Sequence, residues 1–247
     1  MKKTLILLLP LLLGYFITLL LMLPARFALG WLSLPAALQL EEIDGTLWQG
    51  EVQNVVWNKR QTGPLSWSWR SSALLRGDIA ADIGIADPRG IRGSGVVAWN
   101  GDWNIDDARL HLPAALSGEL LGLAVGLGGD VNATLTQLRF TARGCIAARA
   151  DLTWTQGSVE TLAGRLNTGD TQVRLKCINQ QWRADITQRS PQVNSKGQFT
   201  LTGGGDYRWQ SEVTPGADFP SALLNLLNPG ARHQTNGQFT VDTAGRL

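Results

Sequence analysis

Histidine and cysteine are scarce in this chain, whose 247 residues contain only two of each. That leaves little material for a metal site or for a histidine-based catalytic site. An excess of charge of one sign is also lacking, because 22 Lys and Arg residues stand against 20 Asp and Glu residues. A neutral body argues against a nucleic-acid partner, which needs a basic face. A hydrophobic content of 44% argues against disorder.

Catalytic sequence motifs are missing as well. The chain has no G-x-S-x-G, no H-E-x-x-H, no Walker loop and no complete G-x-G-x-x-G. The adjacent Asp106 and Asp107 would point to opposite faces of a strand, so they cannot act as a carboxylate pair. The sequence therefore predicts a protein that is not an enzyme, with no catalytic, cofactor-binding or metal-binding residues.

One long hydrophobic run is present, from Leu5 to Leu23, and it carries no charge. As a helix it would span about 28 Å, close to the roughly 30 Å hydrocarbon core of a bilayer. Lys2 and Lys3 precede it, which favours a cytoplasmic N-terminus. We therefore expect a cytoplasmic stub at 1–4 and a single transmembrane helix at 5–24. The alternative is a cleaved signal peptide, whose apolar part is usually shorter, about 7–15 residues.

The two cysteines fit an exported body. Cys145 and Cys177 most simply form one disulfide in an oxidising compartment. The loop that it closes contributes roughly 3–4 kcal/mol in the chain-entropy description. A redox or metal-binding pair is the weaker alternative, because the chain has no C-x-x-C and no histidine close to either cysteine.

Beyond the hydrophobic run the chain has the pattern of antiparallel strands. Short segments rich in Val, Ile, Thr and Trp alternate with Gly, Pro and Asn-Gly turns. In 181–187, for example, Trp182, Ala184 and Ile186 share one face. Asn100-Gly101 is a strong hairpin signal. We expect a mainly β fold, a curved antiparallel meander with a few short helices that buries one face.

Three Pro-led segments resemble one another and predict helix starts: Leu34–Leu38, Leu112–Leu116 and Phe219–Leu223. Each is followed by a Gly-led strand. This echo predicts two related β-rich repeats, 30–111 and 112–247, the second carrying a short partial repeat at its end. Chance recurrence in a chain rich in Ala and Leu is the alternative.

Ten tryptophans admit two interpretations. Trp67 and Trp69 lie two residues apart and so share one face of a strand, and Trp48 is placed to stack near Trp57. Large aromatic residues in strands usually fill the interior. A binding surface for an apolar or aromatic partner is the alternative.

The order of these features is more specific than any one of them. A hydrophobic N-terminal run and a Leu-Pro-Ala-Ala-Leu segment precede Gly45-Thr46-Leu47-Trp48-Gln49-Gly50. Tryptophan-containing strands, a central Leu-Pro helix and the distant cysteine pair follow. This order resembles the protein N family of the bacterial type II secretion system, and the hexapeptide is similar to that family's G-T-x-W-x-G pattern.

The resemblance implies a non-enzymatic inner-membrane component with its bulk in the periplasm. It would act as a scaffold or accessory interaction module in the export of folded proteins. The implied partners are the inner-membrane platform proteins, with the outer-membrane secretin as a further candidate, and membrane lipid through the anchor. Gly45, Thr46, Trp48 and Gly50 are the candidate interaction residues.

A second resemblance, to the architecture of AsmA-like proteins, gives a different expectation. In that class a membrane-anchored curved sheet is proposed to bind or transfer lipid, although this chain is far shorter than most such proteins. A lipid-binding protein needs an open apolar stripe on its concave face, whereas a scaffold would fill that space with side chains. Both predict the same alternation of apolar and polar residues.

Overall fold

The structure is a computed structural model, and it describes residues 2–30, 38–57, 60–121, 125–141, 143–161, 164–220, 232–233 and 238–246. Its internal contacts divide the chain into two compact units, Met1–Arg89 and Gly90–Leu247. All strand pairings described within the two units are antiparallel. The prediction of a mainly β, antiparallel fold is therefore correct.

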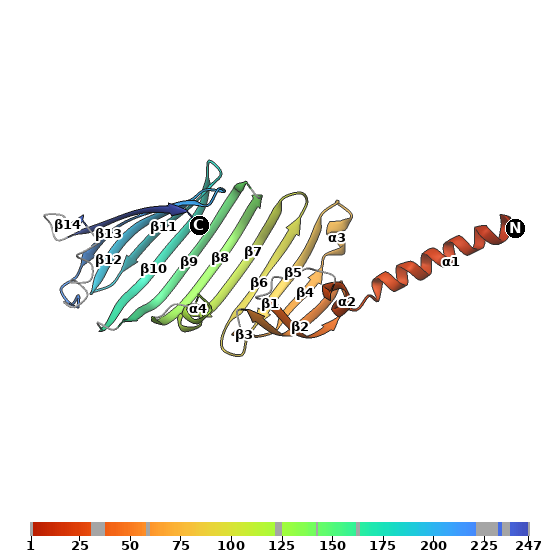
Figure 1. The fold of residues 1–247 in the computed structure, drawn as a ribbon, viewed down its shortest axis with the longest axis horizontal. Helices are drawn as coiled ribbons and strands as arrows, with labels where there is room; N and C mark the ends of the chain where they lie inside the picture. The colour runs from red at the N-terminus through yellow and green to blue at the C-terminus, as the bar shows by residue number, and fades with distance from the viewer. Residues whose placement is uncertain are drawn as a thin grey trace. The chain divides into compact units, whose positions relative to one another are not determined.

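The N-terminal unit combines helices with a small sheet (Figure 1). Its elements are α1 (Lys2–Leu21), α2 (Ala25–Gly30), β1 (Leu38–Gly45), β2 (Gln49–Trp57), β3 (Arg60–Thr62), β4 (Leu65–Trp69), α3 (Ser71–Leu74) and β5 (Ile79–Ala86). The strand order is β1-β2-β4-β5, and β3 pairs with β2 beside this path. The alternation of Leu65, Trp67 and Trp69 with two serines in β4 gives this strand one apolar and one polar face.

The predicted transmembrane helix at 5–24 is wrong. Within the described ranges no helix is long and apolar enough to cross a membrane. The helix α1 begins at Lys2 and ends at Leu21, with Pro10 inside it. Pro24 lies beyond the helix and pairs with Thr46 in an isolated bridge. The helix includes Lys2 and Lys3 and stops at Leu21, so it does not coincide with the predicted span at 5–24.

The C-terminal unit is one layer of strands with a single short helix (Figure 1). Its elements are β6 (Arg92–Trp99), β7 (Trp103–Pro113), α4 (Ala114–Leu121), β8 (Gly126–Thr141), β9 (Gly144–Thr161), β10 (Gly164–Ile178), β11 (Gln181–Arg189), β12 (Val193–Leu201), β13 (Asp206–Pro215), β14 (Arg232–His233) and β15 (Phe239–Arg246). The order is sequential from β6 to β13, followed by β15 and β14.

Local signals in the sequence are confirmed where the structure describes them. The Asn100-Gly101 turn joins β6 to β7, and Gly101 has a φ of 101° that glycine tolerates. The Leu112–Leu116 segment starts α4 directly after Pro113. The segment at Leu34–Leu38 lies outside the described residues up to 37, and the one at Phe219–Leu223 lies outside them from 221 onward.

The expected pair of repeats is not supported. The expected boundary between residues 111 and 112 falls inside β7. The pairing of β7 with β8 runs from Trp103 to Pro113, across this boundary. Strand lengths also differ, because β4 has 5 residues whereas β9 has 18. The segment at Leu112–Leu116 therefore marks a helix start, but the recurrence does not mark a repeated fold.

Buried hydrophobic side chains are few and mostly small among the described residues. They are Ala25, Val52, Ala73, Ala80, Ile91, Ala114, Cys145, Ala184, Val193 and Phe239. Most large apolar side chains of the sheets are only half-buried. A single layer of strands accounts for this, because it has no second layer to cover its apolar face.

The buried carboxylate of Asp87 connects segments at the C-terminal end of the N-terminal unit. The side chain of Asp87 is 2% exposed and accepts a hydrogen bond from the Gly63 amide at 2.7 Å. It also accepts bonds from the Arg89 amide at 2.7 Å and from the Arg89 guanidinium at 2.9 Å. These donors, led by the guanidinium, lower the pKa of Asp87 from 3.8 to about 2. The Arg89 guanidinium also donates to the Gln61 carbonyl oxygen, so this cluster ties β3 to the end of β5.

We expect Asp87→Asn to lower the free energy of unfolding by about 2 kcal/mol at neutral pH. The folded chain binds the proton of Asp87 less tightly than the unfolded chain. This stabilisation is therefore present above pH 3.8 and is lost as the pH falls through about 2. Urea titrations of the unaltered chain and of Asp87→Asn across this pH range should show that the difference in their free energies of unfolding disappears in acid. The exposed carboxyl variant Glu41→Gln serves as the control, and an Asp87→Asn gap of constant size would contradict the assignment.

Candidate functional site

The Gly-Thr-Leu-Trp-Gln-Gly segment forms the hairpin that joins β1 to β2. Gly45 and Gly50 pair at the end of the ladder. The Thr46 amide donates to the Gln49 carbonyl oxygen at 2.8 Å. Gly45 has a φ of 93°, and a Cβ on Gly50 would lie 2.5 Å from the Trp67 ring. Both glycines are therefore required by the backbone of this turn and by the close approach of a tryptophan.

This hairpin holds the end of α1. The indole N–H of Trp48 donates to the Leu20 carbonyl oxygen at 2.9 Å. The amide of Leu47 donates to the Leu23 carbonyl oxygen, also at 2.9 Å. Carbonyl groups in the last turn of a helix have no partner inside the helix. The hairpin therefore donates one hydrogen bond to the last turn of α1 and one to Leu23, two residues beyond the helix, and so couples α1 to the sheet.

Tryptophans stack the hairpin onto β4. Trp48 meets Trp69 edge-to-face with ring centroids 6.0 Å apart, a favourable geometry for an aromatic pair. The indole N–H of Trp67 donates to the Leu47 carbonyl oxygen at 3.1 Å. The predicted neighbour of Trp48 was Trp57, whose side chain lies outside the described part; Trp69 occupies such a position instead.

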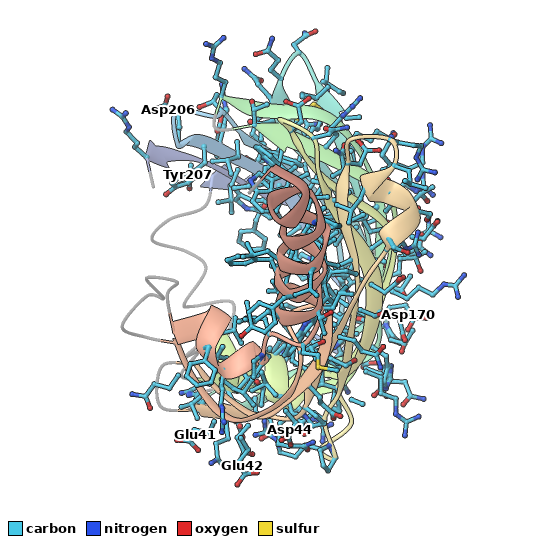
Figure 2. The ribbon with its side chains drawn as sticks, turned by 90° about the vertical axis from the view of Figure 1, so that its right-hand side faces the viewer. Glu41, Glu42, Asp44, Asp170, Asp206 and Tyr207 are labelled. Carbon is cyan, nitrogen blue, oxygen red and sulfur yellow. A yellow bond between two sulfur atoms is a disulfide. The ribbon has the colours of Figure 1, made fainter. Side chains whose placement is uncertain are left out.

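The strand β1 forms an acidic edge of the N-terminal unit. It pairs with β2 on one side, and no described strand pairs with its other side. Glu41, Glu42 and Asp44 are exposed on it, and their side chains point away from the ribbon (Figure 2). Asp44 lies directly opposite Glu51, an unfavourable pairing of like charges. This edge offers unpaired backbone groups beside carboxylates, which suits an extended basic partner.

One face of the C-terminal unit is uncharged and mainly apolar, and we call it the apolar face; its polar members are Thr171, Gln188, Ser195, Ser211 and Thr243. We define it by three rows of side chains that run across the strands from Ala108, Leu110 and Leu112 of β7. The strand registers extend the central row from Leu110 through Ala133, Leu152, Val173, Ile186, Gly197, Ser211 and Val241. No charged side chain stands in these rows, and only Ala184, Gln188 and Phe239 among their members are buried.

The opposite face of the same strands is polar. Its rows start at Arg109 and His111 of β7 and consist of charged residues, Thr, Asn and Gln. Ion pairs join neighbouring strands there, such as Arg208 with Asp242 at 2.7 Å. Asp170 projects from the outer side of the ribbon (Figure 2). The unit is therefore an amphipathic sheet, with one face for water and the other for an apolar neighbour.

The predicted disulfide between Cys145 and Cys177 is present, with an S–S distance of 2.03 Å. Cys145 is fully buried. In the strand registers it lies opposite Phe140, and Cys177 lies opposite Trp182. The disulfide therefore belongs to the C-terminal unit and links β9 to β10 at one end of the apolar face.

Within the described ranges no group of three or more His, Cys, Asp or Glu residues is arranged to hold a metal ion. Sequence reasoning missed the acidic edge and the aromatic residues around the disulfide. The signal for the edge is the run from Leu38 to Gly45, which has three carboxylates and no basic residue. The signal for the aromatic residues is the register itself, which an unaligned sequence does not contain.

Comparison with known proteins gives a consistent result. The family model described as type II secretion system (T2SS), protein N, matches residues 36–242. The chain is 33% identical to the type II secretion system protein N of Vibrio cholerae over 231 residues, which cover 91% of each chain. It is 28% identical to the protein of that name from Aeromonas hydrophila over the full length of both chains. The Pectobacterium carotovorum protein is 28% identical over 91% of this chain and 90% of its own. No solved structure gives a significant match.

Proposed function

Because the chain belongs to the type II secretion system protein N family, we propose that it acts in type II secretion as a non-catalytic interaction module. The β-rich part would lie in the periplasm and bind other components of the secretion apparatus. The inner-membrane platform proteins are the first candidates, and the outer-membrane secretin is the second.

The observation that carries this proposal is the coupling in the N-terminal unit. The candidate residues Gly45, Thr46, Trp48 and Gly50 form a hairpin whose Trp48 is bonded to the end of α1. The strand that enters the hairpin, β1, is the acidic edge. A partner strand that adds to β1 would therefore bind a surface held at a fixed position relative to α1. The disulfide supports the periplasmic location, because disulfides persist in oxidising compartments.

A second candidate function is the binding of lipid, as expected from the resemblance to AsmA-like proteins. The observation that favours it is the apolar face of the C-terminal unit. Its side chains remain half-buried, so the space over the sheet is not filled by the described residues. On the criterion of an open apolar stripe, this face has the property that a lipid-binding protein needs.

In-cell photocrosslinking separates the two functions. A photoreactive residue in place of Glu41 samples the acidic edge, and one in place of Leu152 samples the apolar face. We expect the Glu41 probe to capture identified platform or secretin subunits. A probe in place of Asp151, the neighbour of Leu152 on the polar face, is the matched control.

Capture of phospholipid at Leu152, with no secretion subunit at Glu41, would contradict the interaction module and favour the lipid-binding function. Capture of secretion subunits at Glu41 with no lipid at Leu152 would support the first proposal and contradict the second. An excess of the same product at Asp151 would mark nonspecific labelling in either case.

A further inference from the structure

The apolar face is curled at the end that carries the disulfide. Phe140 of β8 and Trp182 of β11 come together across β9 and β10, with ring centroids 6.2 Å apart. In a flat sheet these two strands would be separated by three spacings, or roughly 14 Å. Trp182 belongs to the apolar face, because it lies two residues from Ala184 on the same strand. The two rings therefore meet on the apolar face at this end, beside the Cys145–Cys177 disulfide.

Backbone contacts between turns close the same end. A Cβ on Gly203, in the turn after β12, would collide with the Arg143 carbonyl oxygen in the turn after β8. A Cβ on Gly144 would lie 2.6 Å from the Gln180 carbonyl oxygen, in the turn after β10. The strands β8 and β12 would stand roughly 19 Å apart in a flat sheet. Three turns thus converge, and the residue that follows Gly144 is the fully buried Cys145.

Away from this end the apolar face stays open within the described part of the chain. No described helix packs against β9 to β13 to any substantial extent. Leu152 and Val173, at the middle of the central row, are only half-buried. The face is therefore a trough with one closed end, lined by side chains that carry no charge.

The curled shape and the uncharged side chains of the apolar face favour a lipid acyl chain as its occupant. A second copy of the sheet would need a matching open face about 10 Å away, which a face curled upon itself does not offer. A flexible acyl chain is narrow and uncharged. From Trp154 to Cys145 the strand β9 runs about 30 Å, about twice the thickness of one bilayer leaflet's hydrocarbon layer. A lipid tail can therefore lie along the strands.

We propose that the C-terminal unit binds single lipid molecules in a blind trough, with the tail ends at the Cys145–Cys177 disulfide and the polar head at the opposite end of the strands. The inference rests on lipid binding as the second candidate function. It adds the orientation of the bound lipid. It also implies that the unit binds lipid at a site closed at one end and is not a channel open at both ends.

Two photoreactive phospholipids test the direction on the full chain in vesicles. One carries a diazirine at the end of an acyl tail, and the other carries it next to the glycerol. We expect the tail-end probe to label residues around Phe140 and Trp182, and the glycerol-side probe to label the row of the apolar face farthest from them, near residues 154 and 188. Mass spectrometry of the labelled peptides identifies the labelled residues, so labels on α1 are distinguished from labels on the apolar face.

A blocking variant gives a second measurement. Ala184→Trp places an indole inside the trough, whereas Gln172→Trp places the same group on the polar face. We expect Ala184→Trp to reduce labelling of the trough roughly 10-fold, the factor that corresponds to 1.4 kcal/mol, and Gln172→Trp to leave it unchanged. The mapping with the unaltered chain still decides the question if Ala184→Trp does not fold.

Each result has a distinct meaning. The same labelling pattern from both probes would overturn the blind trough and leave lipid binding in place. Labelling of neither end of the apolar face by either probe would overturn lipid binding itself. Separate patterns together with loss of labelling in Ala184→Trp would support the proposal.

Discussion

Removing the disulfide with the double substitution Cys145→Ala and Cys177→Ala should lower the free energy of unfolding by about 3–4 kcal/mol. The bridge joins residues 32 positions apart, and the constraint that such a loop places on the unfolded chain accounts for most of that figure. Further stability is lost because Cys145 is fully buried among the converging turns, where Ala leaves a small cavity. Guanidinium titration followed by the fluorescence of the tryptophans measures the change.

The unaltered chain under reducing conditions is the matched control for this variant. Reduction should lower the stability of the unaltered chain towards that of the double variant, short of the cavity contribution because the reduced chain keeps its sulfur atoms, and it should not affect the variant. Before reduction, the denatured chain should contain no free thiol. Free thiols in denatured but unreduced protein would contradict the bridge, and a variant as stable as the parent would contradict its contribution to stability.

Strands and their faces were predictable from the sequence because each strand obeys a local rule. Trp182, Ala184 and Ile186 alternate with polar residues, and the structure places Ala184 and Ile186 in the rows of the apolar face and Trp182 in the adjoining row, opposite Cys177. Gly45 and Gly50 are recognisable from the hexapeptide, since only glycine fits where the backbone needs a positive φ or another group comes too close. The cysteine pairing followed from there being only two cysteines in the chain.

Features that depend on strand register could not be predicted. Phe140 and Trp182 are separated by two strands, and nothing in the sequence indicates that they meet over the disulfide. Trp48 meets Trp69 because β4 lies beside β2 next to the hairpin, a neighbour that the sequence does not indicate. The end of α1 was misplaced for a related reason. An apolar run has no signal for where its helix stops, and here the stop is fixed by the hairpin through Leu23 and Pro24.

Replacing Trp48 should have the largest effect in the N-terminal unit. Trp48→Ala removes the contact with the Trp69 ring and leaves the Leu20 carbonyl oxygen with only the long 3.4 Å hydrogen bond from the Leu23 amide, and we expect a loss of about 3 kcal/mol. Trp48→Phe keeps an aromatic ring but removes the N–H, and we expect a loss of about 1 kcal/mol. In both variants hydrogen exchange at the Leu47 amide, which bonds to Leu23, should become faster.

The two Trp48 variants also distinguish two roles of this side chain: packing inside the N-terminal unit, or direct contact with a partner protein. The N–H of Trp48 is already bonded inside the chain, so stability and capture of secretion subunits by the Glu41 probe should fall together. The exposed Trp99, changed to Phe in the other unit, is the matched control and should affect neither. Trp48→Ala with full stability but no capture would instead make Trp48 a direct contact. In that case the hydrogen bond to α1 would contribute little, and the coupling between hairpin and helix would have to rest on the Leu47 and Thr46 backbone alone.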